Sequence, residues 1–227
     1  MAPKEILQFL NELQENNNRP WFTANKERYD VLQKEFYQFI EQLISGISKF
    51  DISVKNVTPK ETVYRIYRDI RFSPNKLPYK CHFATYICQG GKKSGYAGYY
   101  FHLEAEHENY IGCSLISGGL YMPTPAVLKT VREDIDLNGA EYRKTIAHAK
   151  SFSLFGNEAL KNVPAPFDKN SEYADLLRLK DYSLAKMLTE KDLSKNNLLE
   201  WLLEQYNLIY PFNDLLNKSV AFAYEEC

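Results

Sequence analysis

One stretch of this sequence gathers cations, a single acid and aromatic rings at spacings that suit anion binding. It reads Arg65-Ile-Tyr-Arg-Asp-Ile-Arg-Phe-Ser-Pro-Asn-Lys-Leu-Pro-Tyr-Lys-Cys-His82. A guanidinium group binds phosphate or carboxylate through two parallel hydrogen bonds, and a lysine adds a compact positive charge. The stretch therefore predicts either a site for an anionic ligand or a buried hub of ion pairs.

The residues of this stretch are expected to divide between ligand binding and architecture. Asp69 is the one acid among the cations, and we expect it to hold Arg65 in a structural pair rather than to touch ligand. Pro74 and Pro78 restrict the backbone around the site. The expected anion-binding residues are Arg68, Arg71, Lys76 and Lys80, with Tyr79 at the edge of the site.

The distribution of charge along the chain favours an anionic partner, although the total charge does not. The chain has 227 residues and a formal net charge of −1. Between Lys60 and Lys93, however, there are eight lysines and arginines and only two acids, a local charge of +6. Such a basic patch is typical of proteins that bind an anionic small molecule or a nucleic acid.

Histidine and glutamate side chains form a second candidate site. Alternate residues of a β-strand share a face, so His102 and Glu104 are expected to lie side by side, with His82 near them. This group suits general acid–base chemistry or, alternatively, a pair of hydrogen-bonded residues in a sheet. The catalytic candidates are His82, His102 and Glu104. No metal or cofactor is predicted, because the sequence has no HExxH helix, Walker loop or dinucleotide fingerprint.

A predicted antiparallel meander would position these histidines. Apolar and polar residues alternate near 82–88, 97–104 and 109–116, and the connections are too short for parallel crossovers. Glu106-His107-Glu108 joins the last two segments, and Ser117-Gly118-Gly119 is expected to end the meander. A further strand is predicted over 62–68, with a short helix as the alternative. The expected core residues are Phe83, Ile87, Phe101, Leu103, Ile111 and Leu115.

Helical periodicity accounts for most of the remaining chain. Apolar residues recur every three or four positions over 4–15, 20–48 and 196–222, the last with a predicted break at Pro211. Two more helices, 124–138 and 140–149, are expected on either side of Asn138-Gly139, and short strands are expected at 152–154 and 182–188. The predicted fold is α+β, with a mainly antiparallel sheet covered on one face by long amphipathic helices.

Composition favours a single domain over residues 1–227. The chain is 44% hydrophobic and 25% charged, as is usual for globular proteins, and its length can bury a core without a disulfide or metal. The four cysteines form no CxxC pair, and the N-terminus has no apolar signal region. No stretch approaches the ~18 apolar residues of a membrane span. We therefore expect a cytoplasmic protein with no membrane partner.

Four motifs resemble those of one protein family. They are Asn16-Asn-Asn-Arg-Pro-Trp-Phe22, the basic stretch from Arg65 to Lys80, Gly98-Tyr-Tyr-Phe-His-Leu-Glu104 and Gly118-Gly-Leu-Tyr-Met-Pro123. Their order and spacing are similar, over nearly the whole chain, to the conserved hypothetical proteins of domain-of-unknown-function family twenty-four sixty-one. The resemblance implies a single domain with a shared, unassigned site. Family members usually have a basic residue and a glycine after the proline near position 164, where this chain has Ala165-Pro166.

Three functions are compatible with these residues. The first is a module that binds a phosphate-bearing ligand, either a nucleotide or a nucleic acid, through the stretch from Arg65 to His82. The second is a small enzyme for an anionic substrate, with His102 or His82 as acid–base group and the arginines as electrostatic clamps. The third is a protein-interaction scaffold in which the cations form a charged structural hub.

Overall fold

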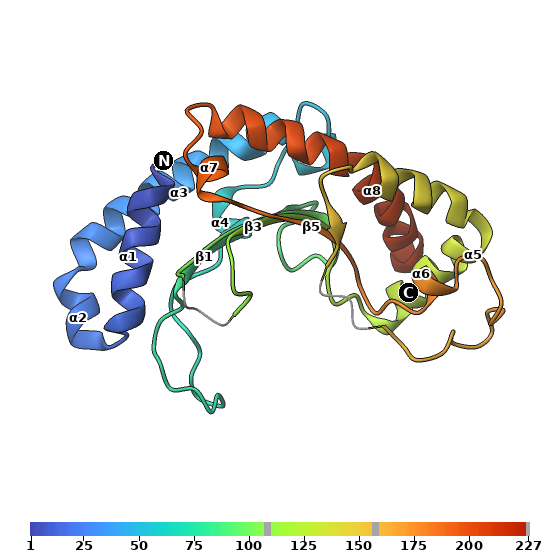
Figure 1. Ribbon diagram of the computed structural model, residues 1–227, viewed down its shortest axis with the longest axis horizontal. Helices are drawn as coiled ribbons and strands as arrows, with labels where there is room; N and C mark the ends of the chain where they lie inside the picture. The colour runs from blue at the N-terminus through green and yellow to red at the C-terminus, as the bar shows by residue number, and fades with distance from the viewer. Residues whose placement is uncertain (107–109, 156–158, 226–227) are drawn as a thin grey trace.

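A five-stranded antiparallel sheet lies at the centre of the protein (Figure 1). The computed structural model describes residues 1–106, 110–155 and 159–225. The strands pair in the order β1-β2-β3-β5-β4, and every pair is antiparallel. Their bounds are β1 (His82–Cys88), β2 (Gly98–Glu104), β3 (Leu115–Leu120), β4 (Ser153–Leu154) and β5 (Tyr182–Met187). The predicted α+β class with an antiparallel sheet is confirmed.

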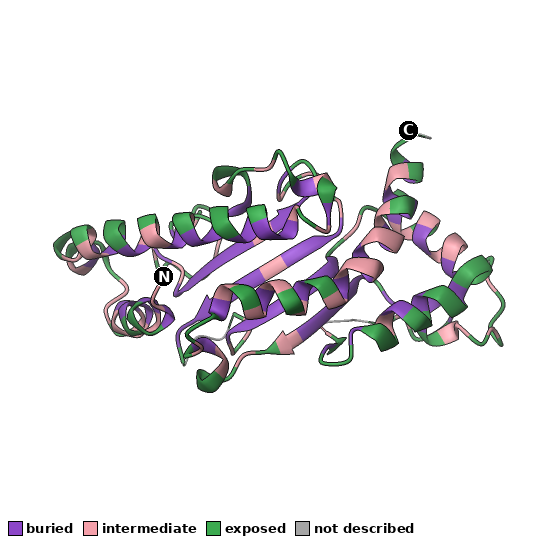
Figure 2. Cartoon of the chain, turned by 90° about the horizontal axis from the view of Figure 1, so that it is seen from above, coloured by how far each residue is buried: buried purple, intermediate pink, exposed green. Residues whose placement is uncertain are grey.

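Two long helices cover one face of this sheet. Figure 1 shows α3 and α8 above the strands, and Figure 2 shows that both turn exposed residues outward and buried residues toward the sheet. The longer helices are α1 (Pro3–Glu15), α2 (Arg19–Ala24), α3 (Lys26–Ile47), α5 (Pro125–His148) and α8 (Leu198–Glu225). The short ones are η1 (Ile52–Val54), α4 (Pro59–Thr62), α6 (Ala174–Leu177) and α7 (Glu190–Leu193).

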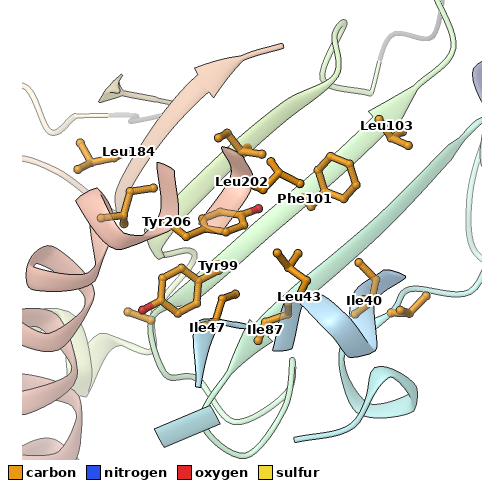
Figure 3. Close-up of a cluster of buried hydrophobic side chains, with 14 of the residues drawn as sticks. Ile40, Leu43, Ile47, Ile87, Tyr99, Phe101, Leu103, Leu184, Leu202 and Tyr206 are labelled. Carbon is orange, nitrogen blue, oxygen red and sulfur yellow. The ribbon is translucent and has the colours of Figure 1, made fainter. Parts of the chain in front are cut away.

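The main core lies between the sheet and these two helices (Figure 3). Alternation along β1 and β2 places Ile87, Phe101 and Leu103 on the helix side, where each is fully buried. Apolar residues of α3 and α8 meet them there. Tyr206 of α8 also donates a hydrogen bond to the carbonyl of Tyr100 at 2.8 Å, so its polar end is satisfied within the core.

The helix predictions differ from the structure at three points. The expected helix 20–48 is divided at Asn25 into α2 and α3. The expected stop at Asn138-Gly139 is only a kink inside α5, where Asn138 has non-helical backbone angles. The expected break at Pro211 is wrong, because α8 continues through it. Phe212 beside this proline is completely buried, so packing offsets the hydrogen bond that proline cannot make.

The third strand of the meander begins later than predicted. Residues 110–114 are not in a strand, and β3 instead contains Ser117, Gly118 and Gly119, which were expected to end the meander. A Cβ on Gly118 would lie 2.4 Å from Ile209, so this glycine lets α8 approach the sheet. The predicted Glu106-His107-Glu108 turn falls mainly outside the described residues.

Two other predictions for the sheet need correction. Residues 62–68 form no strand: α4 ends at Thr62, and only isolated bridges, Val63 with Thr85 and Tyr67 with Tyr79, follow it. Among the expected core residues, Ile111 is only half-buried. Leu115 is buried, but it pairs with His102 and therefore faces the side of the sheet opposite Phe101.

Truncation of a core ring should measure the contribution of this helix-covered face. Phe101 is 0% exposed and packs against Phe36 of α3, with ring centroids 6.2 Å apart. We expect Phe101→Ala to lower the free energy of unfolding by about 3–5 kcal/mol in urea melts. Leu137→Ala, at an exposed position of α5, should change it by less than about 0.5 kcal/mol. A loss below about 1 kcal/mol for Phe101→Ala would contradict the packing described here.

Candidate functional site at the base of a basic arm

The second face of the sheet carries the predicted polar side chains. In the pairing of β1 with β2, His82 lies opposite Glu104 and Ala84 lies opposite His102. Partners in an antiparallel pair point to the same side, so both histidines and Glu104 share one face. This is the face away from α3 and α8. The predicted grouping of His82, His102 and Glu104 is therefore present in the structure.

A chain of hydrogen bonds links three residues of β2 on this face. The Nδ1 atom of His102 lies 2.9 Å from the hydroxyl of Tyr100, and its Nε2 atom lies 2.7 Å from Oε2 of Glu104. A carboxylate can only accept, so Nε2–H of His102 donates to Glu104, and Nδ1 accepts from the Tyr100 hydroxyl. Burial raises the pKa of Tyr100, which keeps that hydroxyl protonated.

Glu104 also organises the connection that follows β2. Its Oε1 atom accepts hydrogen bonds from the backbone N–H groups of Tyr110, Ile111 and Gly112, each at 3.1 Å. Burial alone would raise the pKa of Glu104, but the hydrogen bonds from His102 and these N–H groups hold it below its ordinary value. The ionised carboxylate explains why residues 110–112 turn around Glu104 instead of extending β3.

His82 lies in a different environment from His102. Its ring stacks on Tyr110 with centroids 4.6 Å apart, and its Nδ1 atom is buried without a hydrogen-bond partner among the described residues. Burial, the neighbouring His102 and the cation Lys80 together lower the pKa of His82 to about 3. His82 is therefore neutral at pH 7, and its buried Nδ1 atom has no hydrogen-bond partner among the described residues.

These differences separate the roles of the two histidines. His102 is 0% exposed and both of its ring nitrogens are engaged, so it can hold its neighbours in place but cannot reach a ligand directly. His82 is 8% exposed and adjoins charged residues of the basic stretch. Of the catalytic candidates, His82 is thus the better placed for contact with a ligand.

The basic stretch forms an arm, residues 64–80, that projects below the sheet (Figure 1). Its two sides pair at the base: the N–H of Lys80 donates to the carbonyl of Ile66 at 2.8 Å, and the N–H of Arg68 donates to Pro78 at 3.0 Å. The N–H of Tyr64 donates to Ala84 of β1, which joins the arm to the sheet. The arm therefore has a fixed base beside His82 and a tip farther from the sheet.

Tyr79 serves the attachment of the arm rather than the edge of a ligand site. Its N–H donates to Oδ1 of Asn17, and its carbonyl accepts from Nδ2 of the same side chain. The buried ring of Tyr79 stacks on Phe22, with centroids 3.9 Å apart. The motif from Asn16 to Phe22 thus binds the base of the arm, a role of Asn17 for which the sequence carried no signal.

Cations gather at the base of the arm without a matching number of acids. Lys80 and Arg68 are half-buried, and the only side-chain hydrogen bond of Arg68 among the described residues is to Ser73 at 3.5 Å. Burial, followed by the charges of Arg65, Arg68 and Lys92, lowers the pKa of Lys80. The ammonium groups of Lys80 and Lys92 lie 5.5 and 5.8 Å from the ring centroid of Tyr64. Tyr64 and Lys92 were not among the predicted site residues.

The other two predicted anion-binding residues, Arg71 and Lys76, lie at the tip of the arm. Arg71 binds both carboxylate oxygens of Asp69, at 2.9 and 2.7 Å, so the expected pair of Asp69 with Arg65 is wrong. Lys76 donates to the carbonyl of Ile70 at 3.1 Å. Both the Asp69–Arg71 pair and Lys76 are exposed, and hence no buried charged hub exists at Asp69. Arg71 is the nearest cation because a two-residue spacing in a tight turn brings it back onto the carboxylate.

Other features of the described surface lie away from this site. A hollow of about 470 Å³ is lined by Glu5, Gln8, Arg28, Val31 and Leu32, and a smaller one is lined by residues between 161 and 178. Within the described ranges, no cluster of three or more histidine, cysteine, aspartate or glutamate side chains could hold a metal ion. No helix in the described part of the chain is both long and apolar enough to span a membrane.

The burial of neutral His82 should make stability depend on pH. The unfolded chain binds a proton at His82 near pH 6.5, whereas the folded protein does so only near pH 3. Stability from this residue is therefore complete above pH 6.5 and falls as the pH is lowered, by at most about 1.4 kcal/mol per pH unit. Urea melts between pH 7 and pH 4 should show a shallower decline for His82→Phe than for wild type. The exposed His148→Gln should retain the wild-type slope, and equal slopes for all three proteins would contradict the assignment.

Comparison with known proteins yields one match. The family described as Conserved hypothetical protein (DUF2461) matches residues 5–215, which includes the sheet, the arm and all the site residues above. Searches of curated proteins and of solved structures found no match. Because the match extends over most of the chain, this protein belongs to the conserved hypothetical protein family DUF2461.

Proposed function

We propose that this protein binds a phosphate-bearing anion at the base of the arm, through Arg68 and Lys80. The observation that carries the proposal is the set of cations that no described carboxylate neutralises. Neither Lys80 nor Arg68 forms an ion pair with an acid in the described ranges, although both are half-buried. A partly desolvated cation beside like charges raises the free energy of the folded protein, and a bound anion would offset that cost.

The chemistry of the neighbouring groups favours phosphate. A guanidinium and an ammonium group together supply planar and point-like donors, a combination that suits the several oxygens of a phosphate group. The charges of Lys80 and Arg68 act on the ring of His82, whose buried Nδ1 atom has no partner among the described residues and could make one hydrogen bond once the ring of Tyr110 shifts. The two hollows described above are lined by other segments, so the proposed ligand presents its phosphate to a surface.

Substitution of a ligand-binding lysine should weaken ligand binding without loss of stability, whereas substitution of a structural lysine should lower the melting temperature. Lys80→Met removes a charge that is unfavourable in the free protein, so its melting temperature should equal or exceed that of wild type. Titration calorimetry with pyrophosphate at low ionic strength should show at least 10-fold weaker binding to Lys80→Met, and unchanged binding to the exposed control Lys150→Met. A melting temperature several degrees lower, with pyrophosphate binding intact, would show that Lys80 is structural.

Acid–base chemistry on the same anion is a second candidate function, favoured by the neutral state of His82 next to Lys80 and Arg68. A general base must be deprotonated at working pH and close to its substrate, and His82 meets the first condition. Catalysis predicts turnover of p-nitrophenyl phosphate that falls by about 10²-fold or more in His82→Phe, while pyrophosphate affinity is retained. Equal turnover by the two proteins would leave the chain as a binding module.

We also propose that the protein works in the cytoplasm. Cys88 and Cys113 are free thiols in the structure, and free thiols are typical of reducing compartments.

A further inference from the structure

We infer that the anion bound by this protein is a single-stranded nucleic acid, whose unpaired bases stack on exposed aromatic rings of the arm and of the adjoining sheet face. The inference rests on the proposed function and extends it from one phosphate site at the base of the arm to the arm as a whole. It is carried by exposed rings, by the cations between them and by the shape of the arm.

Exposed rings are unusually frequent around the arm. Phe72 at the tip is 93% exposed, and the guanidinium of Arg71 lies 5.8 Å from the centroid of its ring. Beside the base, Tyr110 is 63% exposed although one face of its ring rests on His82. Tyr121 follows β3 and is 67% exposed. Exposed rings that are grouped on one surface, rather than scattered singly, indicate a binding surface.

Cations are interleaved with the rings along the whole arm. At the tip, Arg71 and Lys76 flank Phe72 in sequence and are exposed; at the base, Lys80 and Lys92 lie against Tyr64. The segment from Lys60 to Lys93 has a charge of +6, whereas the whole chain has a charge of −1. Positive grooves with aromatic platforms are how proteins hold single strands, because the cations follow the phosphates and every base has a face that can stack.

The length of the arm favours a single-stranded nucleic acid over a mononucleotide as the ligand. Phe72 at the tip lies four positions after Arg68 at the paired base, a reach of at most about 14 Å even for a fully extended chain. A single phosphate on Arg68 and Lys80 would leave the tip unused. A single-stranded nucleic acid that starts at the base of the arm can place further phosphates near Lys76 and stack a nucleobase on Phe72.

The rings also distinguish a single strand from other polyanions. A duplex hides the faces of its bases in the stack, so exposed aromatic side chains favour unpaired bases. An acidic peptide offers carboxylates to the cations but no flat partners to the rings. The inference therefore predicts a preference among polyanions of similar charge.

Fluorescence anisotropy of a labelled 15-nucleotide oligothymidylate with the full chain tests this preference. We expect tighter binding of the oligonucleotide than of pyrophosphate or thymidine monophosphate, and effective competition by unlabelled oligothymidylate. A duplex of the same length and polyglutamate of equal charge should compete at least 10-fold less well. Log affinity should fall linearly with log salt concentration, with a slope near −0.7 for each phosphate contacted.

Substitutions at the tip separate this inference from the proposed phosphate site. Phe72→Ala should weaken oligothymidylate binding by about 5- to 100-fold, the usual effect of removing one stacking platform. Lys76→Ala should weaken it and make the salt slope shallower by about 0.7. Neither should alter the melting temperature or pyrophosphate binding, because both side chains are exposed. The matched control Leu137→Ala removes an exposed apolar side chain from α5, far from the arm in Figure 1, and should bind as wild type does.

Two outcomes would overturn the inference while the proposed phosphate site stands. In the first, pyrophosphate binding requires Lys80, but oligothymidylate binds no more tightly than pyrophosphate or keeps its affinity in Phe72→Ala. The other is equal competition by duplex or polyglutamate. Oligothymidylate binding that depends on Phe72 but not on Lys80 would instead contradict the site at the base of the arm.

Discussion

The buried carboxylate of Glu104 is the interaction on which the arrangement of the open sheet face depends. It accepts from His102 on one side and from the N–H groups of residues 110–112 on the other. An ionised group this deeply buried is stable only while those donors surround it. The carboxylate therefore orients His102. It also holds residues 110–112 in a turn, so that β3 begins only at Leu115 and the ring of Tyr110 stacks on His82.

The two faces of the sheet divide architecture from chemistry. On one face, strand residues pack against α3 and α8, and large side chains such as Phe101 and Tyr206 are buried between the sheet and these helices. The other face lies away from those helices and can present polar groups beside the arm (Figure 1). The helical layer still reaches the second face indirectly, because Asn17, which precedes α2, binds the backbone of Tyr79 at the arm's base. The base of the arm is thus held by the connection between α1 and α2.

The charges at the base of the arm are not arranged for stability. Lys80 would be easier to accommodate beside an acid, yet its nearest charged neighbours are cations. The one acid within the arm, Asp69, neutralises Arg71 at the exposed tip and leaves the base unneutralised. If an anion binds there as we propose, it meets charges that are already partly desolvated, so little reorganisation is needed on binding.

The sequence by itself determined the fold class, the face assignments of β1 and β2 and the proximity of His82, His102 and Glu104, because period-two alternation is a local property of the chain. It could not place residues 110–112, since their turn is imposed by a carboxylate on another segment. It predicted a helix break at Pro211, where α8 continues, and two helices at Asn138, where α5 has a kink. For the arm, the sequence identified the cations but not their partners. Asp69 binds Arg71 rather than Arg65, and Lys92 and Asn17 from elsewhere in the chain contact Tyr64 and Tyr79 at the base of the arm. Only the tertiary structure decides such pairings, because the energy of a charge depends on which groups surround it and how deeply they are buried.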